Sequence, residues 1–168
     1  MTSGPPEDEV GRLVAAWRRE RPDLDVAPLE VLSRVTRLSR YLDRQRAAAF
    51  SGGGLEPWEF DVLAALRRSG DPYQLSPGTL VTETLVTSGT MTNRIDRLAA
   101  RGLVRRLPDP DDGRGVLVRL TPPGQELVDR AMASLLTRER ALLADLSAGE
   151  RATLALLLRR LVAPFDAR

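Results

Sequence analysis

The side chains in this sequence that could do chemistry are arginines and carboxylates. The 168 residues hold 25 basic side chains, all of them Arg, and 23 acidic ones, whereas His, Cys and Lys are absent. Without them there is no imidazole base, thiolate nucleophile, Schiff-base amine, disulfide or zinc site of the nitrogen and sulfur type. Carboxylate chemistry remains, but no motif for it is present. The sequence therefore predicts no enzyme and no cofactor.

One predicted helix, residues 87–101, combines side chains that suit nucleic acid. Its apolar side carries Met91, Ile95, Leu98 and Ala99, and its polar side carries Thr90, Asn93, Arg97 and Arg101. Thr and Asn contact base edges or phosphates, and Arg pairs with guanine through two hydrogen bonds. The start of the helix at Thr87 and Ser88 suits a phosphate. The alternative is an ordinary amphipathic surface helix. Such a helix gives no reason for a basic β-hairpin directly after it, and the sequence predicts one there.

The elements that must position these residues are mainly helices, because apolar residues recur at three- and four-residue steps. Breaks at Pro and Gly separate them. The pattern predicts helices over residues 7–20, 28–50, 57–69, 76–83, 87–101, 122–144 and 148–163, and strands over 103–107 and 116–120. Two helices a short turn apart, followed by a hairpin, are the winged helix-turn-helix order. The expected fold class is mainly α with a small β-hairpin wing.

The charges are unevenly spread along the chain. Residues 31–50 carry a net charge of +4 and residues 87–119 one of +3, although the whole chain is only +2.

The tip of the predicted hairpin mixes Asp109, Asp111 and Asp112 with Arg114. Either the aspartates only form the turn, or one of them holds Arg114 extended so that it enters a narrow, A·T-rich minor groove.

The sequence resembles the MarR family of bacterial transcriptional regulators. The resemblance covers roughly residues 28–163 and is specific in residues 87–124, where it runs from Thr87 through Leu98, the Arg101-Gly102 pair and the Asp109–Arg114 turn to Gly124. One departure is Leu85, where the family often has a glycine in the turn between the two helices. The resemblance implies an obligate homodimer that binds a pseudo-palindromic duplex operator as a repressor and is released by a small anionic or aromatic ligand.

The missing Cys and His narrow the signal that such a regulator senses. Oxidant sensing through Cys and zinc sensing through His are excluded, which leaves an organic ligand. The extra N-terminal helix resembles that of the urate-responsive branch of the family, and the resemblance implies a ligand site with urate or a related purine at four positions: Trp17, Asp61, Arg94 and Arg106. Two alternatives stay open. In the first, Arg105 takes the place of Arg106 in the ligand site, because strand neighbours point to opposite faces and only one of the two can face it. In the second there is no ligand site: Asp61 forms a structural ion pair with an arginine, and Trp17 belongs to the core.

Dimerisation is also expected from the residues themselves. Leucines surround the last two predicted helices rather than forming one stripe, so a partner surface is needed. We expect one MarR-like domain over residues 1–168, with dimerisation helices in 7–50 and 122–164 and a DNA-binding lobe in 55–120. A two-fold dimer places its recognition helices about 34 Å apart, one turn of DNA.

Location and the remaining function classes follow from what the chain lacks. No apolar run approaches the roughly 20 residues of a membrane span, and the acidic N-terminus has no secretory signal pattern. We therefore expect a cytoplasmic protein with no membrane partner.

Two other functions compete with that of a regulator. One is a winged-helix module that serves protein–protein interaction. The other is a carboxylate enzyme with a metal at the aspartates of the hairpin tip, which the proline-rich turn argues against.

Overall fold

The computed structural model describes residues 8–112 and 115–166, where seven helices and three short strands follow one another. The chain divides into two compact units, one that ends at Arg46 and one that begins at Ala47. The elements are α1 (Glu9–Glu20), α2 (Ala27–Ser51), α3 (Pro57–Arg68), β1 (Gln74–Leu75), α4 (Pro77–Thr84), α5 (Ser88–Ala100), β2 (Val104–Pro108), β3 (Val116–Leu120), α6 (Pro122–Leu142) and α7 (Ala148–Asp166).

The N-terminal unit joins α1 to the first part of α2 through a small apolar cluster. Val10 and Val14 of α1 are buried together with Val26, which lies just before α2. Asp8 begins α1 as its N-cap, because its carboxylate accepts a hydrogen bond from the backbone N–H of Gly11. The helix predicted over residues 7–20 is present as α1.

Ion pairs add to this cluster and use part of the basic block 31–50. Asp8 pairs with Arg34 at 2.8 Å, and Glu9 pairs with Arg37 at 2.6 Å. The hydrogen bond from Arg34 is the main reason that the pKa of Asp8 lies below its usual value, and Arg37 lowers the pKa of Glu9 in the same way. Two of the five arginines in this block thus have carboxylate partners within the chain, in ion pairs that are exposed to solvent.

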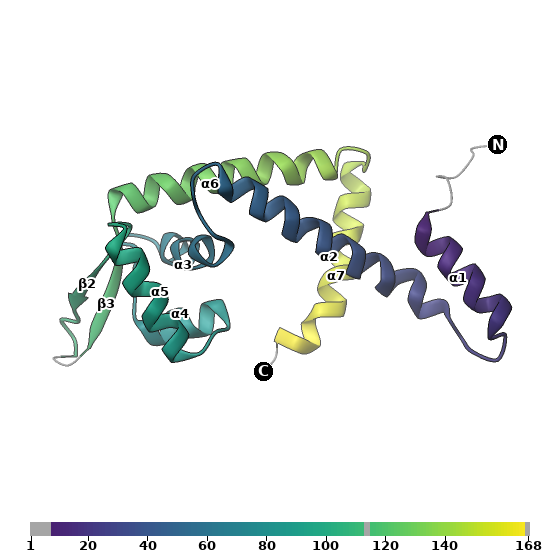
Figure 1. The fold of residues 1–168 in the computed structure, drawn as a ribbon, viewed down its shortest axis with the longest axis horizontal. Coiled ribbons are helices and arrows are strands. Elements are labelled where there is room, and N and C mark those ends of the chain that lie inside the picture. Colours follow the sequence, from purple (N-terminus) through teal and green to yellow (C-terminus); the bar gives the residue numbers. More distant parts are fainter. Residues whose placement is uncertain (1–7, 113–114, 167–168) are drawn as a thin grey trace. The chain divides into compact units, whose positions relative to one another are not determined.

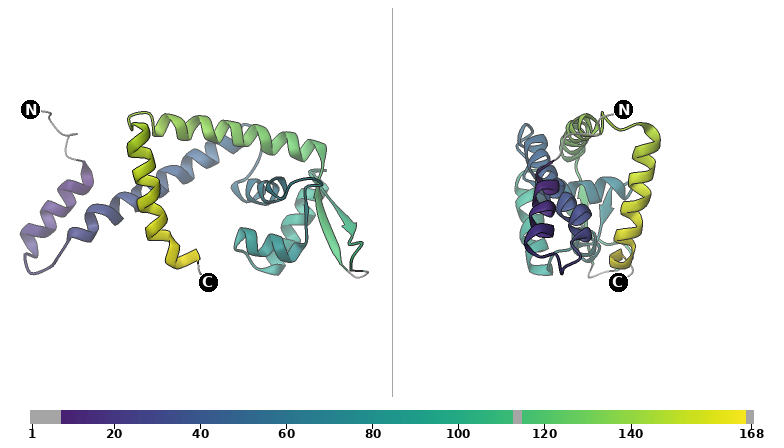
Figure 2. Two further views of the ribbon diagram at one scale, coloured as in Figure 1. Left: turned by 180° about the vertical axis from the view of Figure 1, so that it is seen from behind. Right: turned by 90° about the vertical axis from the view of Figure 1, so that its right-hand side faces the viewer.

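The C-terminal unit contains the winged helix-turn-helix. α3 contacts α4, α4 contacts α5, and the three strands form an antiparallel sheet of order β1-β3-β2. Figure 1 shows α5 beside the hairpin, and Figure 2 shows the hairpin extending beyond the helices of this unit. Val104 pairs with Leu120, and Pro108 pairs with Val116, on either side of the predicted turn. The fold class is confirmed as mainly α with a small β wing.

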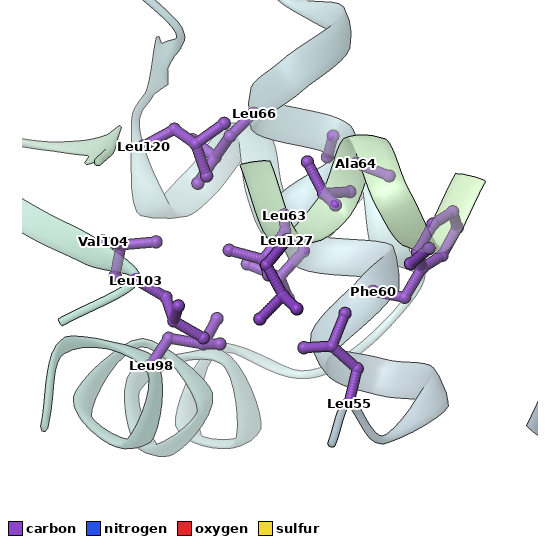
Figure 3. Packing of buried hydrophobic residues seen from close by; sticks show 14 of the residues in the cluster. Leu55, Phe60, Leu63, Ala64, Leu66, Leu98, Leu103, Val104, Leu120 and Leu127 are labelled. Atoms are coloured by element: carbon purple, nitrogen blue, oxygen red, sulfur yellow. The ribbon is translucent and has the colours of Figure 1, made fainter. Parts of the chain in front are cut away.

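The core of this unit forms around α3, which is apolar on nearly every side. Val62, Leu63 and Leu66 of this helix are fully buried. Leu63, Leu127 of α6 and Leu98 of α5 belong to the same buried cluster, part of which Figure 3 shows. This packing holds α5 in place, so the side chains on its exposed face project from a rigid helix.

Two elements differ from the sequence prediction. β1 was not predicted, because two residues give no alternation to detect; Gln74 and Leu75 pair with Arg119 and Val118 of β3. α7 continues through Pro164 to Asp166, whereas the prediction ends at residue 163. A proline so close to a helix end disturbs few backbone hydrogen bonds, so the helix can run past it.

The turn between α4 and α5 has an unusual residue at its tightest point. Leu85 is the C-cap of α4 in the left-handed conformation, with φ 53° and ψ 43°, and the residue is 92% exposed. This is the position where the family resemblance leads one to expect glycine. The left-handed region costs an L-residue about 1 kcal/mol or more, and an exposed leucine regains none of it by burial.

Replacing Leu85 with glycine is expected to raise the free energy of unfolding by about 0.5–1 kcal/mol, because relief of the left-handed strain exceeds the entropy that glycine adds to the unfolded chain. Urea denaturation measures the change. Val86→Gly is the matched control: Val86 packs against the core beside Leu85, so this variant should be destabilised. A less stable Leu85→Gly variant would show that the leucine makes a stabilising contact elsewhere.

α7 leaves much of its apolar surface uncovered within the chain. Its exposed large apolar residues are Leu154, Leu156, Leu157, Leu161, Val162 and Phe165. No helix of the described residues combines the length and hydropathy that a membrane crossing requires.

Candidate DNA interface

α5 has one buried and one exposed face, as its sequence predicts. Met91, Ile95 and Leu98 are at most 1% exposed, whereas Asn93 and Arg97 are exposed. The buried residues belong to the main core cluster. The exposed face therefore offers an amide and a guanidinium from a fixed helix, which are the groups that pair with adenine and guanine edges.

The start of α5 is capped by the predicted threonine. The Thr87 hydroxyl accepts a hydrogen bond from the backbone N–H of Thr90, and the two hydroxyl oxygens lie 2.9 Å apart. Ser88 and Gly89 follow in the exposed first turn. The positive end of the helix dipole lies at this turn, an arrangement that suits a phosphate.

Both arginines in the middle of α5 contact the same aromatic ring. The guanidinium carbon of Arg97 lies 4.7 Å from the centroid of the Trp58 ring, and that of Arg94 lies 5.3 Å from it. The sequence assigns Arg94 to the predicted ligand site and Arg97 to the DNA-facing side of the helix. In the structure the two arginines share an aromatic partner, so the residues predicted for the ligand and those predicted for DNA lie close together on α5.

A carboxylate completes this group of side chains. Glu56 pairs with Arg97 at 3.0 Å and also accepts a hydrogen bond from the indole N–H of Trp58. The hydrogen bond from Trp58, followed by the one from Arg97, holds the pKa of Glu56 below its usual value. We call Glu56, Trp58, Arg94 and Arg97 the Trp58 cluster; with Gly89, Thr90 and Asn93 it lines an open hollow of about 600 Å³.

Arg101, predicted to face DNA, is engaged inside the protein. One of its terminal nitrogens lies 2.6 Å from both carboxylate oxygens of Glu59, and the other donates to the carbonyl of Gly54 at 3.1 Å. The side chain of Glu59 is only 3% exposed. A buried carboxylate needs such a partner. The geometry therefore assigns Arg101 a structural role first, and a DNA contact would compete with it.

The wing contacts α5 through an ion pair. Arg106 of β2 lies 2.5 Å from the Asp96 carboxylate of α5. Arg105 lies opposite Arg119 in the sheet register, whereas Arg106 lies opposite the buried Val118. Because strand neighbours point to opposite faces, Arg106 and not Arg105 is the arginine on the side of α5.

The aspartates at the tip of the wing shape its turn. The Asp109 carboxylate accepts a hydrogen bond from the backbone N–H of Asp111 at 3.0 Å, and the Asp109 N–H donates to the carbonyl of Gly115 at 2.9 Å. These contacts favour the turn explanation for Asp109. In the described part of the chain no three acidic residues gather as a metal site would require. Arg114 lies outside the described residues, so its minor-groove contact stays a prediction.

The four residues of the predicted ligand site belong to different units. Trp17 is 46% exposed on α1 in the N-terminal unit. Asp61 on α3 is half-buried in the C-terminal unit. Arg94 and Arg106 also belong to that unit, and both contact side chains on or beside α5. A shared site of all four residues stays a prediction.

Glu56 and Trp58 were not among the residues predicted from the sequence. They precede or begin α3, and Arg97 follows 41 residues after Glu56, so their meeting is a tertiary contact that helical periodicity does not reveal. The sequence carries one signal for this site: Trp58 follows Pro57 at the start of α3, next to Glu56, which caps that helix.

A helix-turn-helix whose second helix exposes a polar face beside a β-hairpin defines a winged helix-turn-helix DNA-binding protein. Residues 53–115 match the model of the MarR family. The HTH-type transcriptional regulator PecS of Dickeya dadantii is 41% identical over 152 residues, which span 90% of this chain and 92% of that protein. The chain belongs to the MarR family, and the resemblance seen in its sequence is confirmed.

Other relatives agree. The HTH-type transcriptional repressor NicR of Pseudomonas putida is 33% identical over 143 residues, which span 83% of this chain and 89% of NicR. The crystal structure of a MarR mutant from E. coli complexed with operator DNA matches with a TM-score of 0.67 and 28% identity, over 87% of this chain and 97% of that one. The protein is thus a DNA-binding transcriptional regulator, and the prediction that it is not an enzyme is confirmed.

Proposed function

We propose that this protein is a repressor that binds a pseudo-palindromic operator as a homodimer in the bacterial cytoplasm and leaves it when a small anionic or aromatic ligand binds. The observation that carries the proposal is the exposed polar face of α5, with Asn93 and Arg97 beside the capped first turn at Thr87. NicR, a relative, is named a transcriptional repressor, which favours repression over activation.

The uncovered surface of α7 supports the homodimer. Leu156, Leu157 and Leu161 are each about half exposed within one chain. Contiguous apolar surface of this kind marks a protein interface, and a second copy of the chain would supply the same apolar side chains. Size-exclusion chromatography with light scattering should give twice the mass of the chain.

Selection of bound duplexes from a random library tests the DNA-binding face. The selected sequence should contain two half-sites about one turn of DNA apart. Asn93→Ala is expected to reduce the preference for the selected duplex over a scrambled one about 10–100-fold, since one bidentate base contact is lost. Arg130→Ala is the control, because Arg130 is an exposed arginine on α6, paired with Glu126.

The salt dependence of binding separates the regulator from a protein–protein module. Phosphate contacts release counterions, so the affinity for duplex must fall steeply with salt. Duplex binding that is weak and changes little with salt concentration would favour the protein–protein interaction module.

We further propose that the ligand is urate or a related purine, bound by Trp17, Asp61, Arg94 and Arg106. Arg106 pairs with Asp96 on α5, so a ligand that takes over Arg106 or Arg94 would change contacts of the recognition helix itself. The ligand and the operator would then favour different positions of α5. Binding of the ligand would therefore lower the affinity for the operator, which is the coupling that release from DNA requires.

Titration of urate into the complex of protein and operator tests this assignment. Urate should release the DNA from the wild-type protein, and Trp17→Phe and Asp61→Asn variants should respond at higher concentration or not at all. Unchanged operator affinity at millimolar urate would reject urate as the ligand. Variants that respond like wild type would remove their residues from the site.

A further inference from the structure

Trp58 lies outside the two helices of the helix-turn-helix, yet its ring supports two arginines of α5. It is half-buried and packs against the main core cluster, so the ring is held in place. Arg94 and Arg97 both lie within 5.3 Å of its centroid, which is the range of cation–π attraction. An indole in this position can orient the side chains that reach beyond it.

Glu56 links the indole to Arg97. Its carboxylate accepts from the indole N–H and from Arg97. Glu56 is also the N-cap of α3, in a capping box with Glu59, so its backbone is fixed at a helix terminus. In the free protein the Arg97 guanidinium therefore has an aromatic ring on one side and a carboxylate at its edge.

From these contacts we infer that Trp58 is a positioning residue for operator binding. Its indole holds Arg97 extended beside Asn93, and Glu56 is the counter-charge that DNA displaces from Arg97. A stacked guanidinium keeps its N–H groups at the ring edge for hydrogen bonds, and a pre-oriented side chain loses less rotamer freedom on binding. The inference rests on the proposed DNA-binding role of α5.

A double-mutant cycle on operator affinity tests the inference. Trp58→Leu is expected to weaken operator binding about tenfold in the wild-type background. In the Arg97→Ala background the same change should weaken binding less than about twofold, because the side chain that Trp58 positions is gone. A residue that only supports the fold would cost the same in both backgrounds.

Glu56→Gln gives a second measurement that leaves the indole in place. Glutamine keeps a hydrogen-bond acceptor but removes the charge that DNA must displace, so operator affinity should rise about threefold. The rise should vanish in the Arg97→Ala background. Glu83→Gln is the matched control, because Glu83 is another exposed carboxylate paired with an arginine, Arg68.

The chain contains a matched control for the aromatic ring as well. Tyr73 has the guanidinium of Arg67 at 4.8 Å from its ring centroid, and Arg67 also pairs with a carboxylate, Asp129, at 3.0 Å. Tyr73→Leu should leave operator affinity within about twofold of wild type, since none of these three residues belongs to α5. Trp58→Phe retains an aromatic face and should bind better than Trp58→Leu.

The outcomes distinguish a failure of the positioning role of Trp58 from a failure of the DNA-binding function. Equal losses on Trp58→Leu in both backgrounds, or equal losses for Trp58→Phe and Trp58→Leu, would overturn the positioning role while the DNA-binding function stands. A wild-type protein that selects no duplex would overturn the proposed function and this inference with it. Circular dichroism and the active fraction from stoichiometric titration confirm that each variant is folded.

Discussion

Arg101→Ala is expected to lower the free energy of unfolding by about 3 kcal/mol, because it leaves a buried carboxylate without its cation. Glu59 is 2% exposed, and both of its oxygens lie 2.6 Å from Arg101. The backbone N–H of Glu56 also donates to Glu59, at 2.9 Å, so the same carboxylate holds the start of α3 and the end of α5. Guanidinium chloride denaturation measures the loss.

Arg97→Ala is the matched control for this prediction. Arg97 lies in the last turn of α5, four residues before Arg101, which caps the end of that helix. Arg97 also has a carboxylate partner, but both side chains of that pair are more than half exposed, at 53% and 55%. Its loss should cost less than about 1 kcal/mol. If Arg101→Ala were as mild as Arg97→Ala, water would be reaching Glu59, and Arg101 would again be a candidate for DNA.

The contrast between these two arginines shows where sequence reasoning stops. Helical projection put Arg97 and Arg101 on one polar face, since they are four residues apart in the predicted helix 87–101. Their partners come from the start of α3, and the contact of Arg101 with Glu59 spans 42 residues of sequence. Local periodicity determines which face a side chain occupies, but a tertiary partner determines whether its charge is still available.

The helices, the hairpin and the family were predictable because each has a local signal. Caps such as Thr87 and Thr121 and the alternation of the wing strands place these elements without reference to the rest of the chain. Leu85 shows the converse. The family resemblance leads one to expect a glycine at that position, and the turn has a left-handed backbone with leucine in it. Residue type alone therefore does not predict the backbone conformation there.

Gly124→Ala is expected to destabilise the protein by about 3 kcal/mol or more, since overpacking against backbone cannot be relieved by a change of rotamer. A Cβ on Gly124 would lie 2.1 Å from the carbonyl oxygen of Leu103 and 3.0 Å from a methyl carbon of Leu120. The same carbonyl accepts a hydrogen bond from the backbone N–H of Thr121 at 3.1 Å, which ties the start of α6 to the start of the wing.

Thermal and urea denaturation measure this loss, and Gly149→Ala is its control. Gly149 is in the first turn of α7, and a Cβ there would meet nothing within 4 Å, so alanine should leave stability unchanged or raise it by up to about 1 kcal/mol through helix propensity. Because α6 begins directly after β3, a Gly124→Ala protein that still folds should also lose operator affinity as the wing shifts. A variant as stable as wild type would mean that α6 can move away from Leu103 without cost, and the close backbone contact would then not be what fixes the wing.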